Sequence, residues 1–341
     1  NGIKIFDSNG EKLSSQKQSI IDKGLQAKKT IRSNTRKNCI CRYDLLKEYE
    51  KSLIQSIPID DFEGASIVLD LCWGSATACG ENLFRSLGAK VTCINAKPNG
   101  RKINVNCGST HLEDIKKAVL ETNSEMGFAF DGDADRMIAI DGRGRVVDGD
   151  NILYLWGSEL KEKNALPEQR LVATVMSNLG FEKAWVDQGG ILERAAVGDQ
   201  NVRKVMVEKK AILGGEQSGH ILSTLNGLSG DGLLTALQLS NICKKKGLRL
   251  EDLFDQSFKA FPQKLINVPV SPIISQQSLI QSEKFQTSIK KAEQEMGGGG
   301  RVFVRKSGTE SILRVMVESI DESIVEFWSS TISNIALEEF N

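Results

Sequence analysis

Short apolar runs alternate with amphipathic segments over the first three quarters of the chain. The runs with the pattern of buried strands lie at residues 65–71, 90–95, 171–175 and 194–197. Helical spacing of apolar residues predicts helices at about 14–27, 43–56, 80–87, 111–122 and 231–245, at 250–257, and from residues 150, 179 and 200. Strands that alternate with helices are typical of α/β folds. We therefore predict consecutive α/β/α layered domains with mixed sheets.

The pattern changes after residue 262. A strand at 265–270 and a polar helix at about 278–295 are followed by strands at 301–305 and 312–318 and a helix at 321–339. This order predicts a C-terminal α+β domain with an antiparallel sheet. The glycine-rich turn at 142–144 is a candidate hinge between the first two layered domains.

Length and composition exclude several classes of protein. The 341 residues are too many for one compact core. Lysine plus arginine balances aspartate plus glutamate at 44 each, so nothing in the charge indicates a nucleic-acid or membrane partner. No apolar stretch is long enough to span a bilayer. Seven scattered cysteines without a redox Cys-x-x-Cys motif favour a reducing, cytoplasmic location.

Residues 131–136 read Asp-Gly-Asp-Ala-Asp-Arg and lie in a tight loop between two apolar stretches. Alternating carboxylates of this kind are the oxygen ligands that Mg²⁺ prefers. A calcium loop is excluded, because its sixth and twelfth positions are Arg136 and Gly142 instead of glycine and glutamate. The alternative is an acidic turn that faces solvent. The candidate metal ligands are Asp131, Asp133 and Asp135.

Residues 214–220 read Gly-Gly-Glu-Gln-Ser-Gly-His and present several polar groups on a flexible backbone. Glu216 and Ser218 offer an acceptor and a donor that can pair with sugar hydroxyls. His220 is a candidate proton-transfer group near neutral pH. The alternative for His220 is a histidine that merely packs against the loop or caps a helix.

Residues 305–310 join two predicted strands and read Arg-Lys-Ser-Gly-Thr-Glu. Cations, hydroxyls and a glycine that lets backbone amides converge suit a phosphate group. A plain basic hairpin turn explains the same residues equally well. The candidate phosphate-binding residues are Arg305, Ser307, Gly308, Thr309 and Arg314.

Two further glycine–aspartate pairs have the pattern of helix starts. Gly198-Asp199 and Gly230-Asp231 each precede a predicted helix. Aspartate is a favoured N-cap residue, so we expect Asp199 and Asp231 to cap these helices.

Taken together, these loops resemble the phosphohexomutase superfamily, and within it the branch that acts on glucosamine phosphates. The resemblance covers essentially the whole chain, with the motifs in family order and at family spacing. The matching motifs are at 131–136, 147–150, 174–180, 197–199, 214–220, 230–232 and 305–310. It implies a remnant of a first domain and connector at 1–42, α/β domains at 43–145 and 146–257, and an α+β domain at 258–341.

The resemblance also implies a reaction. A phosphoserine phosphorylates glucosamine 6-phosphate to a sugar 1,6-bisphosphate, which is both intermediate and activator, and then recovers the other phosphoryl group. One Mg²⁺ ion per active site would be held by the three aspartates, and Arg136 would steady the transferring phosphoryl group. Glu216 and Ser218 would hold the sugar, with His220 as a candidate acid or base. The small-molecule partner is therefore a hexosamine phosphate, whereas the sequence gives no oligomeric state.

Three departures from the family pattern stand out. The Ser-His-Asn-Pro loop that carries the family's phosphoserine does not occur, and the chain starts just after the place where it would lie. We therefore expect this chain alone to be inactive. A basic residue of the family is replaced by Gln200, and a proline after the phosphate loop is replaced by Ser311.

Two rival hypotheses remain. The first is the same chemistry on mannose or glucose phosphates. The second is a non-catalytic protein that binds sugar phosphates, which the missing serine loop favours and the three aspartates oppose.

Overall fold

The computed structural model describes residues 5, 8, 13, 15–26, 43–58, 61–225, 227, 229–271, 282–307 and 311–341. Their contacts divide the chain into two compact units. The first unit comprises Asn1–Met176 and Gly189–Ser257, and the second comprises Ser177–Gln188 and Phe258–Asn341. The predicted division into four domains stays a prediction. Helix α1 (Ser15–Gln26) matches the first predicted helix.

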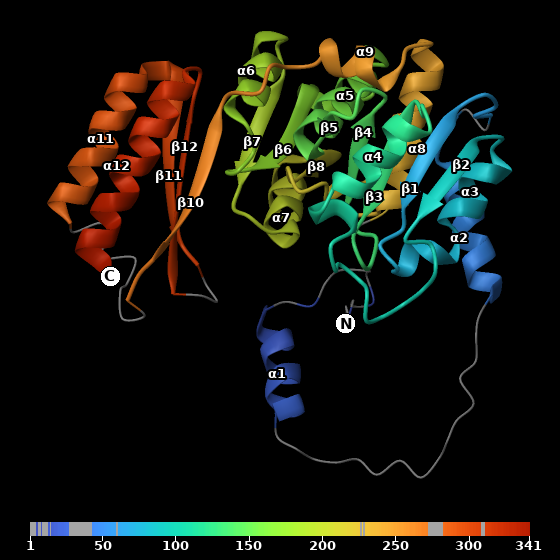
Figure 1. Ribbon diagram of the computed structural model, residues 1–341, viewed down its shortest axis with the longest axis horizontal. Coiled ribbons are helices and arrows are strands. Elements are labelled where there is room, and N and C mark those ends of the chain that lie inside the picture. The colour runs from blue at the N-terminus through green and yellow to red at the C-terminus, as the bar shows by residue number, and fades with distance from the viewer. Residues whose placement is uncertain are drawn as a thin grey trace. The chain divides into compact units, whose positions relative to one another are not determined.

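The first sheet of the first unit is mixed, as predicted, with strand order β2-β1-β3-β4-β5 (Figure 1). Strand β1 is parallel to β2 and β3, and β4 is antiparallel to β3 and β5. Helix α4 packs against β1, β3 and β4, and α3 packs against β2. The elements are α2 (Tyr43–Gln55), β1 (Ser66–Asp70), η1 (Ser75–Ala78), α3 (Gly80–Ser86), β2 (Lys90–Ile94), η2 (Gly108–Thr110), α4 (Glu113–Glu121), β3 (Met126–Phe130), β4 (Met137–Asp141) and β5 (Val146–Val147).

The second sheet of this unit has the order β7-β6-β8-β9, with β9 antiparallel to β8. Helix α8 is buried along most of its length and contacts both α5 and β4, so it joins the two sheets of the unit. The elements are α5 (Gly149–Glu162), η3 (Pro167–Gln169), β6 (Arg170–Thr174), β7 (Ile191–Ala195), α7 (Asp199–Lys209), β8 (Leu213–Gly215), β9 (Ile221–Ser223), α8 (Gly232–Lys246) and α9 (Leu250–Asp255).

The structure of this unit differs from the sequence analysis in two strand assignments and in one turn. Strand β7 begins at Ile191 and not at residue 194, because it is a partly exposed edge strand without a continuous apolar run. The short hairpin β8–β9 was not predicted, since its strands are too short for alternation to be recognised. The turn at 142–144 joins β4 to β5 inside one sheet and is therefore not a hinge between two units.

The second unit is an α+β domain, as predicted. Its antiparallel sheet has the order β10-β12-β11, and α11 and α12 cover the same face (Figure 1). The rings of Phe285 and Phe340 meet edge to face at 5.3 Å in the core beneath these helices. The elements are α6 (Leu179–Asp187), β10 (Gln263–Pro269), α11 (Glu283–Met296), η4 (Gly297–Gly299), β11 (Gly300–Lys306), β12 (Ile312–Ser319) and α12 (Glu322–Phe340).

Helix α6 belongs to this second unit, although it follows β6 of the first unit in the chain. The ring of Phe181 stacks on that of Phe258, with the two ring centroids 5.4 Å apart. The side-chain oxygen of Asn178 accepts the backbone N–H of Phe261 at 2.9 Å.

The predicted fold class is confirmed. Among the described residues, no helix is both long enough and apolar enough to cross a membrane.

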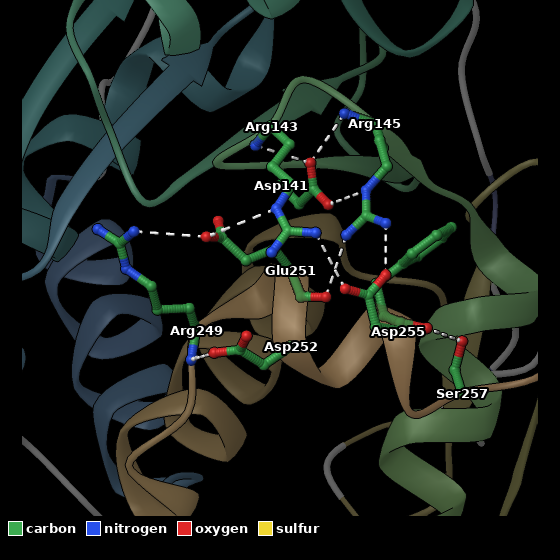
Figure 2. Close-up of polar contacts among 9 residues, drawn as sticks. Asp141, Arg143, Arg145, Arg249, Glu251, Asp252, Asp255 and Ser257 are labelled. Carbon is green, nitrogen blue, oxygen red and sulfur yellow. Dashed lines mark hydrogen bonds and ion pairs between the residues drawn. The ribbon is translucent and has the colours of Figure 1, made fainter.

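The turn after β4 is fixed to helix α9 by a network of charged side chains (Figure 2). The fully buried carboxylate of Asp141 accepts the backbone N–H groups of Arg143 and Arg145 at 3.0 and 2.8 Å. It also accepts Nε of Arg145 at 2.7 Å. The same guanidinium donates to Asp255 and to the backbone oxygen of Glu251. A buried carboxylate needs these donors because it has lost its water.

We expect Arg145→Met to lower the free energy of unfolding by about 2 kcal/mol. Loss of a partner from a fully buried pair costs about 3–5 kcal/mol, but a third (33%) of the Arg145 side chain is exposed. Urea denaturation measures the difference. The matched control is Arg143→Met, which removes a 56% exposed side chain and should cost at most about 0.5 kcal/mol. Equal losses in the two variants would contradict this view of the network.

Candidate active site

The three predicted metal ligands lie together in the loop between β3 and β4. Carboxylate oxygens of Asp131, Asp133 and Asp135 all lie within 4.8 Å of one another. The loop is tight because Ala134 has a left-handed φ of 59° and donates its N–H to the backbone oxygen of Asp131 at 3.1 Å. The N–H of Arg136 reaches the Asp131 carboxylate at 3.2 Å. Local geometry therefore gathers the carboxylates at one point.

This gathering carries an electrostatic cost. Burial, with the nearby charges of Asp135 and Asp133, raises the pKa of Asp131 to about 6. A bound cation relieves that repulsion. Carboxylate oxygens are ligands for hard divalent ions, so the donor set fits Mg²⁺. The guanidinium of Arg136 adjoins the group, with Nε 3.9 Å from the Asp135 carboxylate.

Neighbouring segments hold the metal loop in place through its backbone. The oxygen of Gly132 accepts the N–H of Ser75 at 3.0 Å, and the oxygen of Ala134 accepts the N–H of Gly232 at 2.8 Å. The first contact comes from η1 and the second from the start of α8. The position of the carboxylates thus depends on elements far away in the sequence.

A buried carboxylate at the end of β1 supports the same region and was missed by the sequence analysis. Asp70 is fully buried and accepts the N–H groups of Cys72 and Gly108 at 3.0 and 2.8 Å. It also accepts the side-chain amide of Asn95 at 2.9 Å. Gly108 itself packs closely against the metal loop. A Cβ at this position would lie 2.3 Å from the backbone oxygen of Phe130, which precedes that loop. The sequence signal that could have identified Asp70 is a single charged residue at the end of an apolar strand.

Residues 214–220 comprise the end of β8 and the turn that connects it to β9. Glu216 is buried, and its Oε1 accepts the N–H of Gly198 at 2.8 Å. Its Oε2 accepts the hydroxyl of Ser218 at 3.4 Å. The backbone closes the loop, because the N–H of Glu216 donates to the oxygen of His220 at 3.1 Å. Glu216 therefore ties this loop to the start of α7.

One of the two predicted N-caps is wrong. Gly198 is the N-cap of α7, with a φ of 116° that favours glycine, and Asp199 is the first helical residue. The prediction for Asp231 is confirmed, because its carboxylate caps α8 by accepting the N–H of Leu234 at 3.0 Å. Its second oxygen accepts the hydroxyl of Tyr49 at 2.8 Å.

His220 lies between the metal loop and α7. The residue is buried, with Nδ1 3.5 Å from the carboxylate of Asp135 and Nε2 3.7 Å from that of Asp199. The preceding residue, Gly219, accepts the N–H of Met137 at 3.1 Å. The structure thus brings the end of the second predicted motif against the first.

The predicted phosphate-binding residues belong to the second unit. Arg305 on β11 and Arg314 on β12 are cross-strand partners. Like charges in that position disfavour the sheet unless an anion balances them. Ser307 is buried and donates its N–H to Ile312 at 2.9 Å. The remaining two residues of the prediction, Gly308 and Thr309, lie outside the described residues.

Comparisons with family models and relatives show which proteins this chain is similar to. Models of the phosphoglucomutase/phosphomannomutase family match α/β/α domain II at residues 47–144, α/β/α domain III at 148–261 and the C-terminal domain at 265–332. The chain is 63% identical over 342 residues to the phosphoglucosamine mutase of Prochlorococcus marinus (strain SARG). That alignment covers 100% of this chain and 74% of the relative. The chain belongs to the phosphoglucosamine mutase family.

Other phosphoglucosamine mutases give the same result. That of Synechococcus sp. (strain WH7803) is 52% identical, with 100% of this chain and 74% of the relative covered. Among solved structures, a phosphoglucomutase/phosphomannomutase family protein from Burkholderia thailandensis superposes with a TM-score of 0.74 at 20% identity, over 96% of this chain and 71% of that chain. Aspergillus fumigatus N-acetylphosphoglucosamine mutase, solved with GlcNAc-6P and magnesium, gives 0.70 at 18% identity, over 86% and 66%. The resemblance inferred from the sequence is confirmed.

Proposed function

We propose that this chain supplies the metal site and the sugar-phosphate contacts for the interconversion of glucosamine 6-phosphate and glucosamine 1-phosphate. The reaction runs through a phosphoserine and a sugar 1,6-bisphosphate. The observation that supports the proposal most strongly is the cluster of Asp131, Asp133 and Asp135, whose carboxylate oxygens lie within 4.8 Å of one another. The cluster occurs in a chain that is 63% identical to a phosphoglucosamine mutase. A protein that merely binds sugars has little need for such a cluster.

Asp131, Asp133 and Asp135 would hold one Mg²⁺ ion. When bound, the ion neutralises negative charge on phosphoryl oxygens, which is the main demand of phosphoryl transfer. Arg136 would contribute a second positive charge at the same place. Its position beside Asp135, with Nε 3.9 Å from the carboxylate, supports that role.

The sugar would meet the loop between β8 and β9. Glu216 has one oxygen engaged by a backbone N–H and the other by the hydroxyl of Ser218. A carboxylate in that arrangement suits the cationic amino group of glucosamine better than a neutral hydroxyl. This arrangement supports glucosamine over mannose or glucose as the sugar.

The phosphate that is not being transferred would meet the second unit. The paired guanidinium groups of Arg305 and Arg314 favour a doubly charged anion. We propose that Ser307, Gly308 and Thr309 complete this contact through hydroxyl and backbone N–H donors.

We also propose a reducing, cytoplasmic location. All cysteines in the described part of the chain are free thiols. The sulfur atoms of Cys72 and Cys107 lie 3.7 Å apart without a covalent bond. Thiols in that arrangement are typical of proteins kept in a reducing compartment.

Calorimetry with competing ligands tests the sugar assignment. With Mg²⁺ present, we expect glucosamine 6-phosphate to bind at least about tenfold more tightly than glucose or mannose 6-phosphate. Glu216→Gln keeps an oxygen for Gly198 but removes the charge, so this preference should fall by about tenfold. The control, Glu113→Gln, changes an exposed carboxylate on α4 and should leave the preference intact.

Turnover of the same phosphates by the native gene product distinguishes the remaining hypotheses. Conversion of glucosamine 6-phosphate supports the mutase. Faster conversion of mannose or glucose phosphates would favour the hexose branch. Tight binding without any conversion would favour a sugar-phosphate binding protein.

A further inference from the structure

The first turn of helix α8 packs directly on the metal loop. Gly232 donates its N–H to the backbone oxygen of Ala134 at 2.8 Å. A Cβ at Gly232 would lie 3.0 Å from that oxygen and 2.8 Å from the backbone oxygen of Arg136. Ala134 lies between two of the candidate metal ligands, and Arg136 follows the third. A shift of this helical turn would therefore move the backbone that carries the carboxylates.

Asp231 fixes that turn as its N-cap. Its Oδ1 accepts the N–H of Leu234 at 3.0 Å. Its backbone oxygen accepts the N–H and the hydroxyl of Thr235 at 3.0 and 2.7 Å. A capping carboxylate satisfies a helix N–H that has no partner within the helix. Because Asp231 directly precedes Gly232, the cap and the contact with the metal loop belong to the same turn.

Tyr49 of helix α2 holds the second oxygen of the capping carboxylate. Its hydroxyl donates to Oδ2 of Asp231 at 2.8 Å. Further along both helices, the side-chain amide of Gln238 donates to the backbone oxygen of Ser56 at 3.0 Å. Two hydrogen bonds thus connect α2 with α8, and the first of them ends at the cap itself. Tyr49 therefore links α2 to the turn that contacts the metal loop.

An open pocket lies beside Tyr49 and reaches the metal loop. Its volume is about 260 Å³, and Tyr49, Asp133 and Asp231 are among the residues that line it. Tightly packed side chains would hold the turn of α8 with or without the tyrosine hydroxyl. Next to open space, the hydrogen bond has the larger share in resisting movement. The bond is also partly buried, so loss of the hydroxyl leaves a carboxylate oxygen without its donor.

We propose that Tyr49 is a positioning residue of the metal site. Its hydroxyl fixes the Asp231 carboxylate and with it the first turn of α8. The N–H of Gly232 then holds the metal loop in the shape that binds Mg²⁺. Groups that orient metal ligands from outside the coordination sphere are worth about 10–100-fold in metal affinity. This inference rests on the proposed Mg²⁺ site and adds to it a residue from a distant helix.

Removal of one hydroxyl tests the inference. We expect Tyr49→Phe to bind Mg²⁺ about tenfold more weakly than the parent chain, because Tyr49 acts on the loop through its backbone. Asp231→Asn keeps an oxygen for Leu234 and an amide that can donate to the tyrosine oxygen, so its affinity should stay within about threefold of the parent. Asp231→Ala loses both contacts and should bind at least as weakly as Tyr49→Phe. The readout is the Kd of Mg²⁺ alone, measured by calorimetry on the whole chain.

The matched control is Tyr43→Phe, which removes the hydroxyl of a 71% exposed tyrosine in the same helix. Its Kd should equal that of the parent chain. If the parent chain binds Mg²⁺ and Tyr49→Phe matches it, the inference is overturned while the proposed function stands. A lower melting temperature without Mg²⁺ and an unchanged Kd would also overturn it, since they indicate a purely structural role. If the parent chain does not bind Mg²⁺, the metal site fails and the inference fails with it.

Discussion

Mg²⁺ binding should disappear when Asp131, Asp133 and Asp135 are replaced together by asparagine. The change keeps the shape of each side chain but removes the charges that hold a hard cation. A ligand present at a hundred times its Kd stabilises the folded state by about 2.7 kcal/mol. We therefore expect the parent chain to gain about that much and the triple variant to gain nothing. Thermal unfolding with and without Mg²⁺ measures both values, and calorimetry measures binding directly.

The triple variant should fold at least as well as the parent chain when Mg²⁺ is absent. Burial and the neighbouring carboxylates raise the pKa of Asp131 to about 6, so the free loop is destabilised by its own charges. The control replaces three exposed aspartates, Asp22, Asp61 and Asp114, by asparagine. That variant loses the same formal charge and should bind Mg²⁺ like the parent chain. Saturable Mg²⁺ binding by the first variant would refute the assignment of these ligands.

Gly149→Ala should lower the free energy of unfolding by about 3 kcal/mol, the upper end of the cost of overpacking. Gly149 is the first residue of α5, and a Cβ there would lie 1.9 Å from the backbone oxygen of Glu216. The neighbouring atoms are backbone atoms of Gln217 and Gly219, so no side chain can turn away. The N–H of Gly149 also donates to the oxygen of Gln217 at 3.0 Å.

The sugar loop would have to move to admit the added methyl group. We therefore expect the affinity for glucosamine 6-phosphate to fall more than about tenfold in the Gly149 variant. Urea denaturation and calorimetry measure the two effects. The control is Gly24→Ala in helix α1, where a Cβ meets nothing within 4 Å. Alanine there should stabilise the helix by up to about 1 kcal/mol. A similar stability for both variants would mean that the contact between α5 and the loop is loose.

Some of the candidate site could be predicted from the sequence because its parts are local. The three aspartates occur within five positions, and a turn is enough to bring their carboxylates together. The two arginines of the second unit flank one hairpin, so pairing of β11 with β12 places them opposite each other. Long periodic helices such as α11 and α12 were also predicted, since one apolar face is visible in any helix of that length.

Other features depend on contacts between distant segments. The hairpin β8–β9 has strands of three residues, too short for a period of two to be read. Asp70 acquires its role through Asn95 and Gly108, which lie 25 and 38 positions away. Local sequence cannot distinguish such a carboxylate from an ordinary one at the end of a strand.

The sequence by itself determined the family, the fold class and the cluster of carboxylates that are the candidate metal ligands. The tertiary structure decided what surrounds them. It placed α6 with the second unit, made Gly198 the cap of α7, and enclosed His220 between Asp135 and Asp199. The physical reason is how far apart in the sequence the contacting residues lie. Turns and helices form from neighbours in the chain, whereas the environment of a buried imidazole is set by segments that meet only when the chain is packed.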